Sequence, residues 1–235
     1  MQTLQSYIDN SERIVFFGGA GVSTESGIPD FRSVDGLYNQ KYKYPPETII
    51  SHSFFISKPQ EFYDFYRDRV IHLDAKPNAA HYKLAELESA GKLTAVITQN
   101  IDGLHQAAGS HTVLELHGSI WRNYCVKCGK PFDIKDVIGA AGVPRCDCGG
   151  IIRPDVVLYE ESLDQHVLLL AEKFLREADL LIIGGTSLVV YPAAGLISMF
   201  KGPLILINKS ATSQDSRASL LIKDNIGEVM SRIHA

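Results

Sequence analysis

Short apolar runs alternate along the chain with segments of helical periodicity. Six runs predict buried strands, at residues 14–17, 95–98, 113–116, 180–183, 204–207 and 219–222. Each run is about four residues long and is followed by a glycine or a polar residue. Continuous apolar runs of this kind are typical of a parallel sheet that is covered on both faces.

Helical spacing is found between these runs. Apolar residues recur every three or four positions over 62–70, 81–88 and 167–175. Asn78 is placed to cap the second of these helices, and a further helix is expected to begin near Pro192 and to stop before Gly202. The alternation of strands and helices predicts an α/β fold with a Rossmann-like, doubly wound parallel sheet.

Two segments interrupt this alternation. Residues 33–77 lack a strong strand pattern, and residues 119–154 hold all four cysteines. We expect the first to be a helical or loop insert and the second a four-cysteine zinc module, together forming a smaller discontinuous domain. The larger, Rossmann-like domain is then expected to consist of residues 1–32, 78–118 and 155–235.

The cysteines form two closely spaced pairs. Cys125 and Cys128 are separated by two residues, and Cys146 and Cys148 follow after a gap of 17 residues. Four thiolates at such spacing form a closed tetrahedral shell around zinc, so one structural Zn²⁺ ion is predicted. Two disulfides or a redox pair are the alternatives, and disulfides are disfavoured because no secretory signal is recognisable.

Composition and charge exclude several classes of protein. The chain has 235 residues, 45% of them hydrophobic, and a formal net charge of −4. A general nucleic-acid binder needs a basic excess, so no nucleic-acid partner is expected. The most apolar stretch, 180–197, is broken by glycines and a proline, which argues against a membrane span. We therefore expect a cytoplasmic protein without a membrane partner.

Polar clusters follow five of the predicted strands. The first is a glycine-rich turn, residues 18–23, which would let the backbone approach a pyrophosphate with the next helix N-terminus facing the anion. This signal is weak alone, because Thr24 replaces the third glycine of the dinucleotide-binding pattern and a simple tight turn has the same appearance. The other clusters are 99–102, 117–118, 185–188 and Asn208. Because carboxyl ends of parallel strands meet at one edge, the five clusters predict a common ligand crevice.

Together these motifs resemble the sirtuins, which are NAD-dependent protein deacylases. The resemblance is carried by residues 19–23, 27–32, 98–102, 116–118, 153–157 and 185–188 and by the four cysteines, in family order. The resemblance covers nearly the whole chain. The chain is similar to the short bacterial members of the family. It implies NAD as co-substrate, one structural zinc ion and an acyl-lysine protein or peptide as partner.

The resemblance also implies catalytic roles. His117 would be the general base acting on the ribose hydroxyls after nicotinamide has left, and imidazole suits this role because its pKa is near neutral. Asn100 would order a water near the ribose. Asp102, with the backbone of Ile101, would hold the nicotinamide carboxamide.

A wider set of residues is implied for cofactor binding. Phe31 would lie against nicotinamide, Arg32 would face the phosphates, and Asn225 would flank adenine. The complete set implied by the resemblance is Gly19, Ala20, Gly21, Thr24, Asp30, Phe31, Arg32, Gln99, Asn100, Ile101, Asp102, His117, Gly185, Thr186, Ser187, Asn208 and Asn225.

The acyl-lysine peptide is expected to add as a strand between two segments, with Val157, Tyr159 and Val189 as contacts. Glu160 stands where the family usually has glycine, and its side chain is expected to crowd the peptide and to favour basic residues in it. Desuccinylase-type sirtuins carry Tyr-x-x-Arg before the Lys-Pro-Asn stretch. Here the matching pair is Tyr63 and Tyr66, so acetyl or other neutral acyl groups are expected in preference to succinyl.

Two other functions remain open at this point. A mono-ADP-ribosyltransferase would use the same scaffold and the same ribose electrophile. A non-catalytic NAD sensor or zinc-ribbon binding module would retain ligand binding without turnover. The sequence leaves the oligomeric state open, and a monomer is expected.

Overall fold

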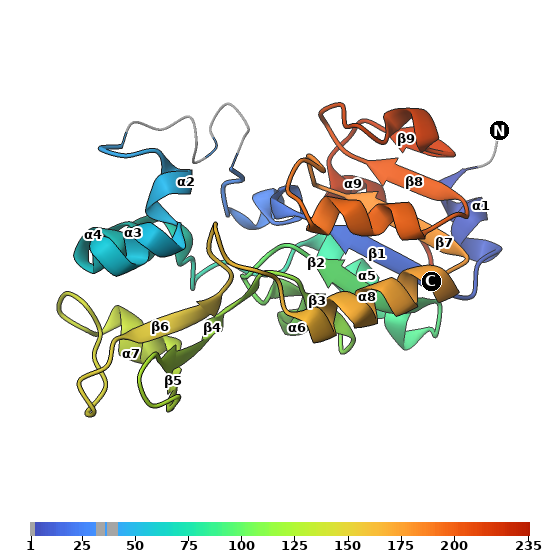
Figure 1. Cartoon of the computed structure of the whole chain (residues 1–235). Helices are drawn as coiled ribbons and strands as arrows, with labels where there is room; N and C mark the ends of the chain where they lie inside the picture. Colours follow the sequence, from blue (N-terminus) through green and yellow to red (C-terminus); the bar gives the residue numbers. More distant parts are fainter. Residues whose placement is uncertain (1–2, 32–35, 37–41) are drawn as a thin grey trace.

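The computed structural model describes residues 3–31, 36 and 42–235. A six-stranded parallel sheet in the order β3-β2-β1-β7-β8-β9 forms the centre of the larger lobe (Figure 1). Its strands are β1 (Ile14–Gly18), β2 (Leu93–Thr98), β3 (Val113–Glu115), β7 (Leu180–Gly184), β8 (Leu204–Ile207) and β9 (Leu220–Ile222). All six predicted strands are therefore confirmed, and so is the doubly wound class, since the chain runs outward from β1 in one direction and then from β7 in the other.

The carboxyl ends of the central strands lie level with one another. Gly18 at the end of β1 pairs with Thr98 on one side and with Gly184 on the other. Gly184 in turn pairs with Ile207 of β8. The loops that follow these four strands consequently start from one edge of the sheet, at its switch point between β1 and β7.

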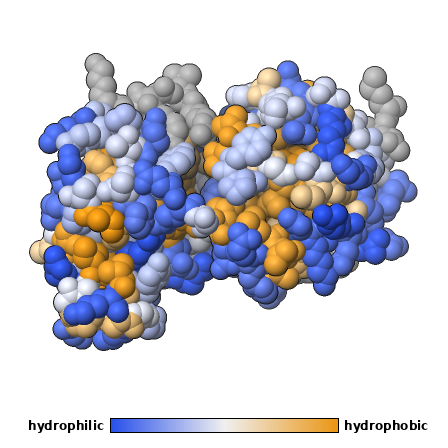
Figure 2. All heavy atoms as spheres, viewed as in Figure 1, coloured by the Kyte–Doolittle hydropathy of each residue, from blue (hydrophilic) through white to orange (hydrophobic). Residues whose placement is uncertain are grey.

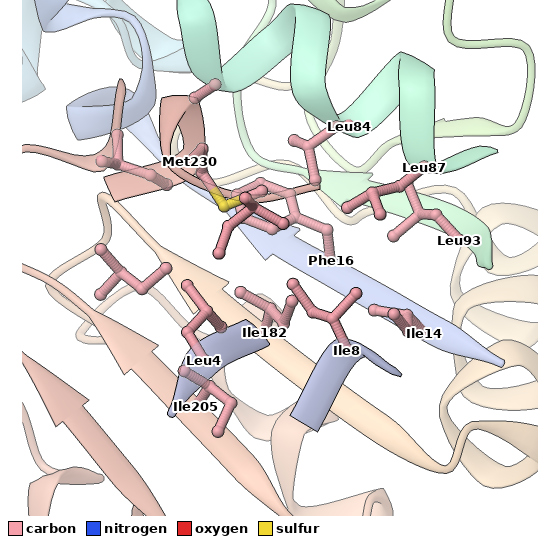
Figure 3. Close-up of a cluster of buried hydrophobic side chains, with 14 of the residues drawn as sticks. Leu4, Ile8, Ile14, Phe16, Leu84, Leu87, Leu93, Ile182, Ile205 and Met230 are labelled. Atoms are coloured by element: carbon pink, nitrogen blue, oxygen red, sulfur yellow. The ribbon is translucent and has the colours of Figure 1, made fainter. Parts of the chain in front are cut away.

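One face of the sheet is covered by α1 (Leu4–Asp9), α5 (Ala79–Ser89) and α9 (Ile226–Ser231). Figure 3 shows Leu84 and Leu87 of α5, Met230 of α9 and Ile8 of α1 directed onto Phe16 and its neighbours in the sheet. Asn78 caps α5 as predicted, accepting a hydrogen bond from the amide of Ala80.

The opposite face is covered by α8 (Gln165–Glu177) and by η5 (Ala193–Met199). Val15 and Phe17 of β1 point to this side, whereas Ile14 and Phe16 point to the other, as the two-residue period of a strand requires. The helix expected from Pro192 is present as η5, but it is a 3-10 helix. Gly195 lies in its middle and weakens regular α-helix formation there.

The smaller lobe combines the two segments that interrupt the alternation. The first holds α2 (Pro46–Ile49), α3 (His52–Ser57) and α4 (Pro59–Phe65), which continues as the π-helix η4 (Tyr66–Val70). The second holds α7 (Ile134–Ile138) and an antiparallel sheet in the order β5-β4-β6. The bounds of these strands are β4 (Gly118–Cys125), β5 (Pro131–Asp133) and β6 (Ile152–Val156). The sequence did not predict this sheet.

Both segments contribute to a single apolar core. Phe55 and Tyr63 of the helical segment belong to the same buried cluster as Ile120 and Ile152 of the antiparallel sheet. The two segments therefore fold as one body although about forty residues of the larger lobe separate them in the sequence. Figure 2 shows the two lobes in space-filling form, with apolar surface exposed on each of them in this view.

The remaining elements are short. They are η1 (Ala20–Val22), η2 (Thr24–Ser26), α6 (Leu104–Ala107) and η6 (Asp215–Arg217). Within the described ranges, none of the helices has the length and apolar character needed to cross a bilayer.

Candidate active site

A cavity of about 1030 Å³ lies at the carboxyl edge of the parallel sheet, where it meets the smaller lobe. It is large enough for a dinucleotide, since ligand sites usually measure about 300–1,000 Å³. Most of the residues expected to bind a cofactor line it, namely Ala20, Gly21, Thr24, Asp30, Phe31, Gln99, Asn100, Ile101, Asp102, His117, Gly185, Thr186, Ser187, Asn208 and Asn225. The fold thus brings together segments from more than two hundred residues of sequence.

Two of the expected cofactor residues remain. Arg32 lies outside the described residues. Gly19 does not line the cavity and packs instead against the loop after β7, where an added Cβ would come within 2.8 Å of Thr186 Cβ. Gly21 makes a similar approach, since its Cβ would lie 2.8 Å from Gly185 Cα. These glycines therefore allow the loops after β1 and β7 to pack against each other.

The segment after the glycine-rich turn differs from the expectation. Instead of a regular helix directed at an anion, the structure has the two single-turn 3-10 helices η1 and η2. Gly27, at φ +85°, ends η2, and Pro29 follows two residues later. These residues stop helix growth, because glycine favours the left-handed region and proline removes a backbone donor.

His117 follows β3 and faces the cavity. Its Nδ1 lies 2.9 Å from the carbonyl oxygen of Gln99, which can only accept. Nδ1 therefore carries the proton and donates it to Gln99, so that Nε2 holds the free lone pair. Burial lowers the pKa of His117 below its ordinary value of 6.5, although the hydrogen bond to Gln99 opposes this shift. The imidazole is thus neutral near pH 7 and is able to accept a proton.

Asn100 and Asp102 meet at a serine that the site prediction missed. Ser23 Oγ donates to Asp102 Oδ2 at 2.7 Å and accepts from Asn100 Nδ2 at 3.0 Å. Asn100 is further fixed by its backbone amide, which donates to Thr98 Oγ1. Ser23 was already part of the glycine-rich motif, but its link to residues almost eighty positions away depends on the fold.

Gln99 offers a donor that has no partner within the described chain. Its Nε2 atom is buried and makes no hydrogen bond, and its Oε1 is 3.5 Å from Thr186 Oγ1. A buried donor without a partner is costly, and this one belongs to a residue of the cavity wall, where a ligand can satisfy it. The oxygen-rich ribose and phosphates of NAD match this donor, so the residues present fit that cofactor.

Two of the three residues expected to bind the peptide line the cavity. Val157 and Tyr159 line the cavity, whereas Val189 is exposed and does not. Its neighbours Val190 and Tyr191 line the cavity instead. The cavity thus has one rim after β6 and another after β7.

Glu160 lines the cavity, and its carboxylate is bonded to the start of α3. It has φ +76°, a backbone conformation that favours glycine. Its carboxylate is turned toward the start of α3, where it accepts hydrogen bonds from the amide and from Oγ of Ser53, both at 2.9 Å. These bonds hold the carboxylate against α3 at the rim of the cavity, and the effect of Glu160 on a bound peptide stays a prediction.

The two tyrosines that bear on acyl preference, Tyr63 and Tyr66, also differ in whether they reach the cavity. Tyr66 lines the cavity, whereas Tyr63 is buried and its hydroxyl donates to the carbonyl of Ile152. Arg69 lines the cavity as well, and its Nε lies 2.6 Å from Asp68 Oδ2. A carboxylate of the same helix therefore lies beside the arginine on this wall.

The four cysteines gather at one point of the smaller lobe. Their sulfur atoms all lie within 4.8 Å of one another, and none is in a disulfide. Two of the sulfur–sulfur distances, Cys125 to Cys148 and Cys128 to Cys146, are 3.4 Å and 3.7 Å. Thiolates about 2.3 Å from a tetrahedral zinc ion stand about 3.8 Å apart, so this cluster fits one zinc ion.

The Sir2 family model matches residues 19–192, a range that includes the glycine-rich turn, His117 and the cysteine cluster. The chain belongs to the Sir2 family. Among its Sir2 relatives, a protein of Clostridium acetobutylicum described as an NAD-dependent protein deacetylase is 60% identical over 235 residues. That alignment covers 98% of this chain and 96% of the relative. The family predicted from the sequence motifs is therefore confirmed.

Solved Sir2 structures agree over nearly the whole fold. One, with a deacetylated p53 peptide and 3′-O-acetyl ADP ribose, has a TM-score of 0.91 and 42% identity, covering 97% of this chain and 94% of its own. Another, described as Sir2–p53 peptide–NAD⁺, has a TM-score of 0.88 and 40% identity, covering 99% and 97%.

Proposed function

We propose that this Sir2-family protein is an NAD-dependent protein-lysine deacetylase that releases nicotinamide and forms O-acetyl-ADP-ribose. The observation that carries the proposal is the position of His117. It lines the same cavity as Asn100, Asp102 and the glycine-rich loop, and its Nε2 atom is unprotonated. A relative with 60% identity over nearly its full length is described as an NAD-dependent protein deacetylase.

The residues divide the work along the cavity. Bound NAD supplies an electrophilic ribose carbon from which nicotinamide leaves. Asp102 and the backbone of Ile101 hold the nicotinamide end, and Phe31 covers it from water. The free Nε2 of His117 accepts a proton from a ribose hydroxyl, while Gln99 directs its unpaired Nε2 donor at a ribose oxygen.

The other half of the cofactor is assigned to the loops after β1, β7 and β8. Backbone amides over 20–24 are assigned to the phosphates, and Arg32, which lies outside the described residues, keeps the same assignment from the sequence motif. Thr186, Ser187, Asn208 and Asn225 hold the adenosine. The packing of Gly19 and Gly21 against Gly185 keeps these loops at the short distance that one dinucleotide spans.

The acetyl-lysine substrate is assigned to the wall of the cavity near the smaller lobe. The peptide adds between the segment of Val157 and Tyr159 and the segment of Val189, and backbone hydrogen bonds provide most of its affinity. Cys125, Cys128, Cys146 and Cys148 hold one zinc ion whose shell has no open position, so its role is to stabilise the smaller lobe.

The domain division and location belong to the same proposal. Residues 1–32, 78–118 and 155–235 form the NAD-binding domain, and residues 33–77 and 119–154 form the small domain. The common core of the helical segment and the antiparallel sheet supports this division. Four cysteines suited to bind metal as thiolates fit a reducing compartment, which supports a cytoplasmic location.

The test measures nicotinamide release and O-acetyl-ADP-ribose with NAD and an acetylated peptide. We expect peptide-dependent release that falls about 10²–10⁴-fold in His117→Ala, the usual contribution of a general base. His166→Ala is the matched control, because His166 is exposed in the first turn of α8. Transfer of labelled ADP-ribose to protein without deacetylation would instead identify a transferase, and NAD binding without turnover would identify a sensor.

Acyl preference is the second part of the proposal: neutral acyl groups are preferred to succinyl. The carboxylate of Asp68, 2.6 Å from Arg69 Nε, supports this, because its negative charge partly offsets the positive charge that an acidic acyl group would need. We expect kcat/KM for an acetylated peptide to exceed that for the succinylated peptide of the same sequence. The reverse order, abolished in Arg69→Gln, would contradict this preference.

A further inference from the structure

The loop that carries Asp102 is tied to the smaller lobe by a tryptophan. Trp121 lies on β4, and its indole Nε1 donates to the carbonyl oxygen of Asp102 at 2.8 Å. One residue earlier, the amide of Ile120 donates to the carbonyl of Ile101 at 3.0 Å. Two successive residues of β4 therefore hold two successive carbonyls of the loop after β2.

The contact between Trp121 and this loop is close. Gly103 has φ +75°, and a Cβ added to it would lie 2.7 Å from Trp121 Nε1 and 2.8 Å from Trp121 Cδ1. The indole ring thus occupies the space that any larger residue would need. Together, the glycine and the hydrogen bond fix the orientation of the peptide group between Asp102 and Gly103.

The side chain of Asp102 is held from other directions. Its Oδ2 accepts from Ser23 Oγ at 2.7 Å, and its Oδ1 accepts from the amide of Leu104 at 2.9 Å. These bonds fix the carboxylate, whereas Trp121 fixes the backbone. A rotation of either the backbone or the carboxylate would displace the other, because both are attached to the Cα atom of Asp102.

Trp121 does not itself reach the site. It is not among the residues that line the cavity, and 45% of its surface is exposed. Its position therefore differs from that of a core tryptophan, whose role is to fill buried volume. Its hydrogen bond to the loop is made by the Nε1 atom of the ring.

We propose that Trp121 is a positioning residue for the nicotinamide end of the site, acting through the backbone of Asp102. Because β4 is part of the smaller lobe, this contact makes the orientation of Asp102 depend on where that lobe lies. The inference rests on the proposed assignment of Asp102 to nicotinamide.

The main test compares two ligands in Trp121→Phe, which keeps an aromatic ring but has no N–H donor. Titration calorimetry with NAD and with ADP-ribose separates the nicotinamide end from the rest of the site, because ADP-ribose lacks nicotinamide. We expect Kd for NAD to rise about 3- to 10-fold, the range that one hydrogen bond provides, and Kd for ADP-ribose to change less than about 2-fold. Tyr82→Phe, another exposed aromatic change, is the control and should alter neither value.

Turnover provides a readout that a merely structural role would not change in the same way. Trp121→Phe should raise KM for NAD and the nicotinamide concentration needed for inhibition by a similar factor, with kcat and melting temperature close to those of the wild type. Equal weakening of NAD and ADP-ribose, or unchanged binding of both, would overturn the inference. A wild-type protein that does not bind NAD at all would overturn the proposed function and this inference with it.

The wild-type chain offers an independent measurement. Trp121 is its only tryptophan, so fluorescence excited selectively in tryptophan reports on this residue alone. NAD should change the emission and ADP-ribose should change it much less. An equal response to the two ligands would contradict the assignment of Trp121 to the nicotinamide end.

Discussion

At the residue scale, the chemistry depends on which nitrogen of His117 carries the proton. The carbonyl of Gln99 accepts from Nδ1 and thereby leaves Nε2 as the base. The same backbone segment continues into Asn100 and Asp102, so one loop sets both the tautomer of the base and the residues beside it. This arrangement ties the proton acceptor to the residues assigned to the nicotinamide ribose.

The buried position of His117 predicts a specific pH dependence. Burial disfavours the imidazolium form, so the base stays neutral until the pH falls below its ordinary pKa of 6.5. We therefore expect the acidic limb of the kcat/KM profile to have its midpoint below pH 6.5. His166→Ala should retain the profile, and a midpoint above pH 6.5 would contradict the assignment of His117 as the base.

Several residues of the site could be predicted because their motifs are contiguous. The strand ends at Gln99, His117 and Thr186 follow directly from apolar runs in the sequence. Ser23 and Trp121 could not be assigned roles in this way, because their partners Asp102 and Asn100 are distant in sequence and meet them only through the sheet and through β4.

At the element scale, the segment after β6 is joined to β6 by a partly buried ion pair and to α3 by a histidine. Glu161 accepts two hydrogen bonds from Arg153, at 2.8 Å and 2.9 Å, and its Oε1 lies 2.8 Å from His52 Nδ1. The amide of Leu158 also donates to its carboxylate. This network fixes the rim of the cavity on which Tyr159 lies.

The network predicts a loss of stability in acid. Burial opposes ionisation of Glu161, but the hydrogen bonds from Arg153, Leu158 and His52 outweigh it and lower its pKa to about 2. Because the folded-state pKa lies below the ordinary 4.5, this contribution is fully present above pH 4.5 and is lost as the pH falls toward 2.

Substitution tests this contribution. Glu161→Gln should lower the free energy of unfolding by about 1.5–3 kcal/mol at pH 7, the usual value of charged hydrogen bonds, and by less near pH 2. Denaturant unfolding at several pH values measures both effects, with the exposed Glu177→Gln as control. An equal loss at every pH would show that ionisation of Glu161 is not the cause.

The elements differ in how far the sequence predicted them. The parallel strands are uninterrupted apolar runs that are buried along most of their length, so their pattern is clear. β4 has buried and exposed positions in irregular order, and its consecutive residues Trp121 and Arg122 are both exposed. It forms through pairing with β5 and β6, which its own sequence does not reveal.

At the scale of the whole molecule, the metal cluster and the smaller lobe depend on each other. Cys125 and Cys146 are members of the same buried core as Phe55 and Ile134. A zinc ion therefore closes a core that has contributions from both segments of the smaller lobe. Without metal, the four sulfur atoms would lose the bonds that join them across this core.

Metal removal should consequently affect a large part of the smaller lobe. We expect a strong chelator, or Cys146→Ser, to lower the melting temperature and to increase hydrogen exchange in β4 to β6 and in α3 and α4. The parallel sheet should remain protected, and added Zn²⁺ should restore the chelated protein but not the variant. Exchange confined to residues 125–148 would show that the cluster acts only locally.

The chain leaves the larger lobe and returns to it at one place, which affects how its length can change during evolution. Gly118 leaves the larger lobe where Val156 returns to it, and the two residues face each other across β4 and β6. An added Cβ at Gly118 would overlap the carbonyl of Asp155, so the departing and returning backbones are in direct contact. The segment between them is therefore closed at its base like a stem with a loop. Insertions or deletions beyond that base can change its length over generations without shifting a single strand of the parallel sheet.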